Sequence, residues 1–193
     1  CHGDVDNSTA FIDNRDVHNK GAVLETNLGK NFLFTILDVE NLAPGGTPVV
    51  TYQVADADGN VYDVLNDPEF ASANGARIRA YYAWTTDDIY NGDELGNLVN
   101  GGRAPGDDHD IIVESATANG DGSFTYTSGV NIPADYSGDG MAAMGGNPVV
   151  NVNGTFEKAS PQSTFFYPGS AREQVVAIEA CDSCHENLTR HFG

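Results

Sequence analysis

Two of the three cysteines in this 193-residue chain stand close together near its carboxyl end, directly before a histidine. The stretch Cys181-Asp182-Ser183-Cys184-His185 has the spacing of a c-type haem attachment site, in which each thiol adds to one vinyl group of a single haem. The adjacent histidine is then placed under the iron as an axial ligand. The pattern predicts haem c bound covalently through Cys181 and Cys184, with His185 as the proximal ligand.

Three other chemistries compete for the same residues. A zinc site would need about two further ligands, and the interior of the chain has no second Cys-x-x-Cys or His-x-x-x-His pair. A thioredoxin-like redox pair is expected within a βαβ pattern, which this chain lacks. A structural disulfide or two free thiols in a β-protein is the remaining alternative. Haem attachment is the favoured interpretation.

The chain also begins with a cysteine followed by a histidine, Cys1-His2. One interpretation is the end of another Cys-x-x-Cys-His motif, in which Cys1 forms a thioether bond to haem and His2 is the proximal iron ligand. The alternative is the lipid-bearing amino-terminal cysteine of a lipoprotein, although a residue as bulky as histidine is unusual directly after such a cysteine. We favour the truncated haem motif, and we then expect the chain to be a segment of a longer polypeptide.

Three further histidines are candidates for the distal position on haem iron. His191 lies six residues after His185, which is about 600° around a helix, so the two side chains would not share a helix face. His191 is therefore expected to bind the iron of a different haem and complete bis-histidine ligation, with a surface histidine as the alternative. His18 is a weaker distal candidate close to the first motif. His109, in an acidic stretch, is expected to be solvated.

Acidic residues outnumber basic ones by 28 to 9, which gives a formal net charge of −19. Such a charge repels phosphate backbones and anionic lipids, and it argues against nucleic-acid binding and polybasic membrane attachment. The sequence contains no run of roughly 20 apolar residues that could form a membrane-spanning helix. Because 40% of the residues are hydrophobic, the chain has enough apolar side chains to fold around one core.

The region between the cysteine motifs has the pattern of short strands. Val, Ile, Thr, Tyr and Phe gather in short runs between turn-forming residues, and no run keeps an apolar period of 3.6. The expected strands cover residues 31–40, 48–55, 61–65, 77–85, 110–118, 123–128, 141–144, 149–157 and 164–167. This number and spacing predict a mainly β domain, either a Greek-key split β-barrel or a β-sandwich.

Turn-forming residues indicate where some of these strands are connected. Residues 119–122, Asn-Gly-Asp-Gly, tolerate positive φ and predict a hairpin between 110–118 and 123–128. Residues 56–60, Asp-Ala-Asp-Gly-Asn, resemble the start of a Ca2+ loop, but Asp67 stands where the bidentate glutamate belongs, so a turn is favoured over calcium binding. The polar interval 86–109 is expected to be a surface loop.

After Gly169 the pattern changes to that of a helix. Ser170 is placed as an N-cap with Glu173 at the third helical position, and apolar residues follow at Val175, Val176 and Ile178. The sequence therefore predicts a short C-terminal helix that leaves the β-domain and carries the cysteine motif.

The last part of the chain resembles the junction between a β-domain and a multihaem domain in outer-membrane decahaem c-type cytochromes of the MtrC and OmcA type. The matching residues are Arg172, Val175, Val176, Ile178, Cys181, Cys184, His185, Leu188 and His191, whereas Phe192 departs from the family's His-Gly pattern. Stretches of the β-region, such as TPVVTYQVADADGNVYD, are similar to strands of the family's β-domains. The resemblance implies three parts: residues 1–29 as the end of a preceding multihaem domain with a connector, 30–169 as the β-domain, and 170–193 as the start of a following multihaem domain.

The resemblance also implies extracellular electron transfer, with electrons passed along closely spaced haems to Fe(III) or Mn(IV) minerals, soluble metals or flavins. The chain would act as an electron-transfer protein with metal reductase activity rather than as a conventional enzyme. Its expected place is the extracellular face of the outer membrane or the medium, and its expected partners are a porin–cytochrome complex or other multihaem cytochromes. An alternative function of another class is an exported β-sandwich module for binding or adhesion, whose cysteine motif is incidental or binds zinc.

Overall fold

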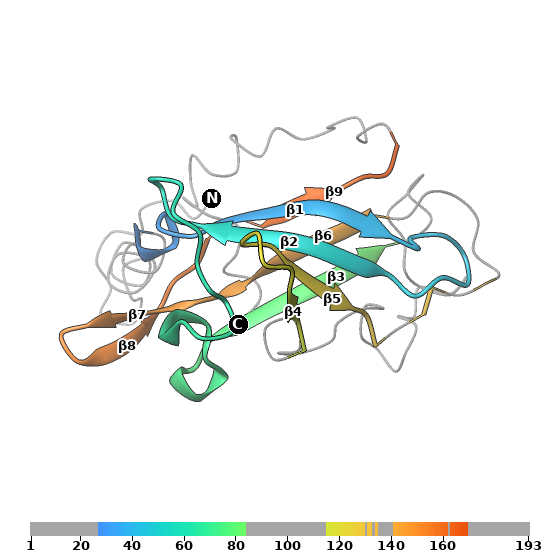
Figure 1. The fold of residues 1–193 in the computed structure, drawn as a ribbon. Helices are drawn as coiled ribbons and strands as arrows, with labels where there is room; N and C mark the ends of the chain where they lie inside the picture. The colour runs from blue at the N-terminus through green and yellow to red at the C-terminus, as the bar shows by residue number, and fades with distance from the viewer. Residues whose placement is uncertain are drawn as a thin grey trace, which may run out of the picture.

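The computed structural model describes residues 27–83, 115–129, 131–132, 134, 141–161 and 163–169. The strands in this part of the chain are β1 (Leu33–Glu40), β2 (Val49–Ala55), β3 (Arg77–Ala83), β4 (Thr117–Ala118), β5 (Phe124–Thr127), β6 (Met141–Asn147), β7 (Val149–Val152), β8 (Thr155–Lys158) and β9 (Thr164–Phe166). Short 3-10 helices, η1 (Pro68–Phe70) and η2 (Ser72–Asn74), lie between β2 and β3. The described domain is mainly β, as the sequence predicts (Figure 1).

The strands form two sheets and a separate hairpin. The first sheet has the order β1-β2-β5-β4, the second has the order β3-β6-β9, and β7 pairs with β8. All of these pairs are antiparallel. The first sheet lies across the second (Figure 1), and the edge strands β1 and β9 contact each other. Within the described residues no ladder joins the two sheets into a closed barrel.

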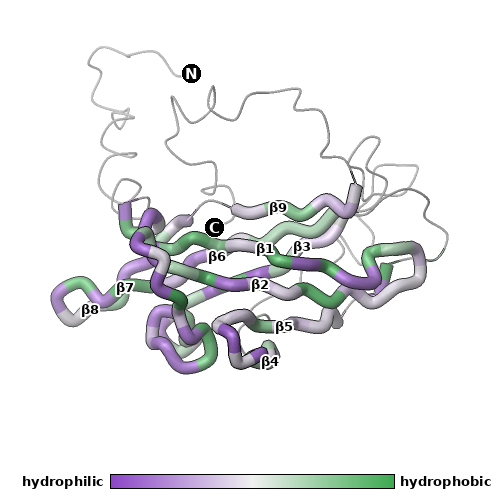
Figure 2. Tube along the Cα trace, turned by 45° about the horizontal axis from the view of Figure 1, so that its top comes forward, coloured by the Kyte–Doolittle hydropathy of each residue, from purple (hydrophilic) through white to green (hydrophobic). Residues whose placement is uncertain are grey.

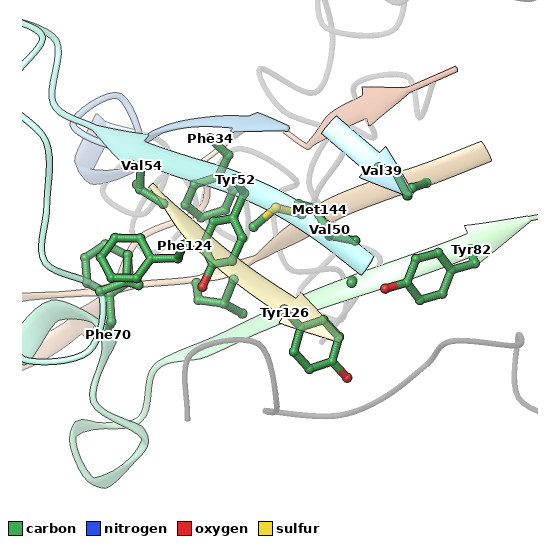
Figure 3. Close-up of a cluster of buried hydrophobic side chains, with 14 of the residues drawn as sticks. Phe34, Val39, Val50, Tyr52, Val54, Phe70, Tyr82, Phe124, Tyr126 and Met144 are labelled. Carbon is green, nitrogen blue, oxygen red and sulfur yellow. The ribbon is translucent and has the colours of Figure 1, made fainter. Parts of the chain in front are cut away.

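The core lies between the two sheets, and it follows from the alternation of side chains along each strand. On β2, the side chains of Val50, Tyr52 and Val54 are fully buried, while the residues between them are half-buried. The other strands contribute Phe34, Val39, Ile78, Ala80, Tyr82, Phe124, Tyr126, Ala142 and Met144 to the same cluster (Figure 3). Hydrophilic residues gather in several of the turns, whereas the β7–β8 hairpin mixes hydrophilic and hydrophobic residues, as Figure 2 shows. One apolar cluster therefore holds both sheets together.

A β-bulge in β1 keeps this alternation consistent with the sequence. The pairing with β2 shifts between Ile36 and Asp38, so that Leu37 is the extra residue. Without the shift, Asp38 would point into the core after Phe34 and Ile36. With it, Asp38 is exposed and Val39 is buried. The bulge therefore lets one strand bury apolar side chains on both sides of an acidic residue.

One predicted strand, residues 61–65, is wrong. Only Val61 forms an isolated bridge, to Ala55, and the chain then turns. The Oδ2 atom of Asp67 accepts a hydrogen bond from the backbone N–H of Asp63, and Oδ1 of Asp63 accepts one from the N–H of Leu65. These side-chain bonds replace a strand ladder, which is the ordinary behaviour of aspartate in turns.

A second predicted strand, residues 149–157, is a hairpin instead. Strands β7 and β8 pair with each other through the turn at Asn153 and Gly154, whose φ angles are 53° and 91°. Asparagine followed by glycine is the preferred pair for such a tight hairpin turn, because both residues tolerate positive φ. The expected strand 141–144 extends to Asn147 and becomes β6, the central strand of the second sheet.

The hairpin predicted around residues 119–122 is confirmed. Ala118 pairs with Phe124, and the N–H of Asn119 donates to the carbonyl of Ser123 at 3.0 Å. The Oδ1 atom of Asp121 accepts hydrogen bonds from the N–H and the hydroxyl of Ser123, which lowers the pKa of that carboxyl. Its first strand is shorter than expected, since 115–116 are not in a strand. Residues 110–114, and the predicted loop 86–109, lie outside the described residues.

Buried tyrosine makes the domain sensitive to alkaline pH. Burial raises the pKa of Tyr52 well above its ordinary value of 10.0, and burial together with nearby carboxylates raises that of Tyr62. In the unfolded chain these phenols lose their protons near pH 10, whereas the folded protein retains them. The free energy of unfolding should therefore fall as the pH rises above about 10, by up to about 1.4 kcal/mol per pH unit for Tyr52.

Urea denaturation at a series of alkaline pH values tests this expectation. The variant Tyr52→Phe should show a shallower fall in unfolding free energy, while Tyr167→Phe, outside the core cluster, serves as the control. Parallel pH profiles of the wild type and Tyr52→Phe would contradict the assignment.

Candidate functional site

The residues predicted to bind haem lie outside the described residues. They are Cys1, His2, His18, Cys181, Cys184, His185 and His191, and the same holds for His109 and the predicted C-terminal helix. The candidate site is therefore defined by the sequence, which supplies two thiols and an imidazole in the order that c-type haem attachment requires. What the structure describes is the β-domain between the two motifs and the contacts at its first and last residues.

The first described residues rest against the chain segment that precedes β9. Residues 27–29 form a helical turn, and the N–H of Phe32 donates to the carbonyl of Gly29 at 3.0 Å. A β-carbon built on Gly29 would stand 2.3 Å from the carbonyl oxygen of Ser160 and 2.6 Å from the nitrogen of Pro161. Only glycine permits this approach of two backbones. The chain therefore enters the β-domain directly beside the segment that leads into β9.

Asn147, at the end of β6, holds the same segment. Its Nδ2 donates to the carbonyl of Ala159 and to Oγ of Ser160, both at 3.0 Å. Ser160 is buried, so the amide satisfies a hydroxyl that has little access to water. Sequence reasoning did not single out Asn147, whose only local signal is its place before Pro148. The entering residues and the segment before β9 thus lie together at the end of β6.

An aromatic cluster lies next to the entering chain. The ring centroids of Phe32 and Tyr62 are 5.2 Å apart, and Phe70 packs edge-on against both rings at 5.8 Å and 5.4 Å. The Tyr62 hydroxyl donates to the carbonyl of Asn31 at 3.3 Å. Burial raises the pKa of Tyr62, and so do the negative charges of Asp56, Glu69 and Asp67. The phenol is therefore neutral at physiological pH and acts as a packing and hydrogen-bonding group.

The aspartate-rich stretch 56–60 forms a turn, as predicted. Oδ1 of Asp56 accepts hydrogen bonds from the backbone N–H groups of Asp58 and Asn60, at 2.9 Å and 2.8 Å. Oδ2 accepts one from Nδ2 of Asn60 at 2.8 Å. These bonds lower the pKa of the Asp56 carboxyl, chiefly through the Asn60 side chain. The carboxylate that would begin a calcium loop is thus engaged by the turn itself.

Two further properties of the described residues bear on the site. They contain no group of three or more His, Cys, Asp or Glu side chains arranged to hold a metal ion. No helix among them is long and apolar enough to cross a membrane.

Neither a family model nor a curated protein sequence matches this chain. Among solved structures, the fold is similar to that of MtrC from Shewanella baltica OS185, with a TM-score of 0.53 and 13% sequence identity. The match covers 86% of this chain and 29% of the MtrC chain. The chain therefore spans less than a third of the length of MtrC and shares its fold across that part.

Proposed function

We propose that this chain is a β-domain segment, with its flanking haem-attachment motifs, of a surface multihaem c-type cytochrome that carries electrons out of the cell. The observation that carries the proposal is the motif Cys181-x-x-Cys184-His185, placed directly after a β-domain. The similarity of that domain in fold to MtrC supports it independently, because the fold comparison does not depend on the cysteines.

The proposed roles follow from the chemistry of each side chain. The thiols of Cys181 and Cys184 form thioether bonds to haem, and the imidazole of His185 binds its iron from one side. Cys1 and His2 serve a haem before the β-domain in the same way. His191, with His18 as a second candidate, supplies distal imidazoles to neighbouring irons. Haem bound in this way supplies one-electron transfer.

The β-domain serves as a support for the haem-bearing segments. It holds its entering chain at Gly29 against Ser160 and fixes the segment before β9 through Asn147. Electron transfer between haems requires fixed distances, which a packed domain provides better than a flexible linker. The proposed acceptors are Fe(III) or Mn(IV) minerals, soluble metals or flavins, and the proposed location is the extracellular face of the outer membrane.

The test is to produce the 193-residue chain in the periplasm of a bacterium that has the c-type maturation system. We expect a Soret band that remains with the protein after acid–acetone extraction, because thioether-linked haem is not extracted. A protein with no visible absorption after such maturation would refute the proposal. Stoichiometric zinc without a visible band would favour the zinc-stabilised module instead.

A further inference from the structure

Two asparagine–glycine pairs stand at the tips of hairpins in the described domain, and the fold restrains them differently. Asn119-Gly120 lies between β4 and β5, and Asn153-Gly154 lies between β7 and β8. Such pairs are chemically reactive, because glycine has no side chain to keep its backbone nitrogen away from the asparagine amide carbon. Two more pairs, at 91–92 and 100–101, lie outside the described residues. The two described pairs allow the effect of the fold on this chemistry to be compared within one molecule.

The side-chain amide of Asn119 is held by its neighbours. Its Nδ2 donates to Oγ of Ser123 at 2.9 Å and to Oγ1 of Thr125 at 3.0 Å, and its Oδ1 accepts from the Thr125 hydroxyl at 3.2 Å. Thr125 belongs to β5, which is paired on both sides within the first sheet. The amide carbon of Asn119 therefore cannot turn toward the nitrogen of Gly120 unless these bonds break.

The side-chain amide of Asn153 is not restrained in this way. It is exposed, and it makes no hydrogen bond within the part of the chain that the structure describes. The β7–β8 hairpin pairs with no other described strand and extends away from both sheets (Figure 1). A β-carbon built on Gly154 would meet nothing within 4 Å. A short two-stranded hairpin of this kind opens readily at its tip.

One hydrogen bond restrains the nitrogen that would react. The N–H of Gly154 donates to Oδ1 of Asn151 at 2.8 Å. This bond must break, and the turn must open, before the nitrogen can face Cγ of Asn153. Asn151 is exposed, so water can take over the broken bond at little net cost. The restraint on this pair is therefore weaker than the three bonds that hold Asn119.

We propose that Asn153 is a site of spontaneous deamidation, which the fold permits there and suppresses at Asn119. The backbone nitrogen of Gly154 gives its proton to water or hydroxide and attacks Cγ of Asn153. A new C–N bond forms, the bond from Cγ to the amide nitrogen breaks, and that nitrogen takes up a proton and leaves as ammonia. Water then opens the cyclic imide at either carbonyl, which leaves aspartate or isoaspartate at position 153. No electron is transferred, and water is the only co-reactant.

Either product would alter the hairpin. Each adds one negative charge to a chain whose formal net charge is −19. Isoaspartate also adds one carbon to the main chain, so the two-residue turn no longer matches the pairing of Val152 with Thr155. We therefore expect the β7–β8 hairpin to lose its pairing as the protein ages. This inference requires neither haem nor the proposed function.

Peptide mapping of the full chain by mass spectrometry, during incubation of the folded protein at mildly alkaline pH, tests the proposal. Chymotrypsin cuts at Phe124 and Tyr126, between the two pairs, and electron-transfer fragmentation distinguishes isoaspartate from aspartate. We expect Asn153 to deamidate about tenfold faster or more than Asn119. In urea, where both turns are unfolded, the two pairs should react at similar rates.

Three variants separate the causes. Thr125→Val removes the hydroxyl that bonds both ends of the Asn119 amide, so deamidation of Asn119 should become several-fold faster while that of Asn153 stays unchanged. Asn151→Ala frees the Gly154 N–H and should speed the reaction of Asn153 several-fold. Gly154→Ala should slow it about tenfold or more, because a β-carbon hinders the attacking nitrogen even though it strains the turn.

Equal rates at Asn119 and Asn153 in the folded wild type, or no reaction at Asn153, would overturn the proposal. A faster reaction in Gly154→Ala would overturn the attack by the Gly154 nitrogen, because strain in the turn alone would then govern the rate. Circular dichroism shows whether each variant is folded. If Thr125→Val does not fold, Ser123→Ala removes one of the three bonds on Asn119 and should change its rate in the same direction.

Discussion

Replacement of both cysteines of the motif, Cys181→Ser together with Cys184→Ser, is expected to abolish covalent haem attachment at the carboxyl end of the chain. A serine hydroxyl does not form the thioether bond that holds haem c, so His185 would be left as a single, weak iron ligand. Intact-protein mass spectrometry after periplasmic maturation should show the double variant lighter than the wild type by the mass of one haem. We expect a complete loss rather than a partial one.

Matched variants make this result specific. Cys1→Ser removes the remaining cysteine of the chain and should leave the haem at Cys181 and Cys184 in place. His191→Ala should also leave it in place and should not alter its absorption spectrum, because we expect His191 to serve another iron. A double variant that carries as many covalent haems as the wild type would show that attachment does not depend on Cys181 and Cys184.

The β-domain could be predicted because its local patterns agree with its packing. In β2 the apolar residues alternate with polar ones, and the alternation alone identifies Val50, Tyr52 and Val54 as the buried face. The pairing of strands, by contrast, could not be predicted from local patterns. Strand β2 pairs with β5, which joins positions as distant in sequence as Tyr52 and Phe124, and no local pattern specifies such neighbours.

The errors in strand prediction arose where apolar runs conceal turn chemistry. Residues 149–157 contain alternating apolar side chains, yet Asn153 and Gly154 in their midst form the tight turn of a hairpin.

The motif around Cys181 could be predicted without knowledge of the fold, because covalent haem attachment depends only on the local spacing of the cysteines and the histidine. Asn147 carries no local signature, since its role arises only when the end of β6 lies beside Ala159 and Ser160.

The variant Gly146→Ala is expected to have the largest effect on stability in the domain. Gly146 has a φ angle of 133°, which is unfavourable for any residue with a β-carbon. A β-carbon there would also stand 1.9 Å from the carbonyl oxygen of Arg77 and 2.9 Å from Cα of Ile78. These are backbone atoms of β3, so they cannot move aside unless the two strands separate. We expect a loss of about 2–5 kcal/mol in the free energy of unfolding.

The matched control is Gly154→Ala in the β7–β8 turn. Gly154 also has a positive φ angle, 91°, but a β-carbon there would meet nothing within 4 Å. Its alanine variant should therefore lose only about 1–2 kcal/mol, through backbone strain alone. Urea denaturation followed by circular dichroism measures both values, and their difference reports the contact between β6 and β3. Equal losses in the two variants would show that β3 moves aside without cost at this position.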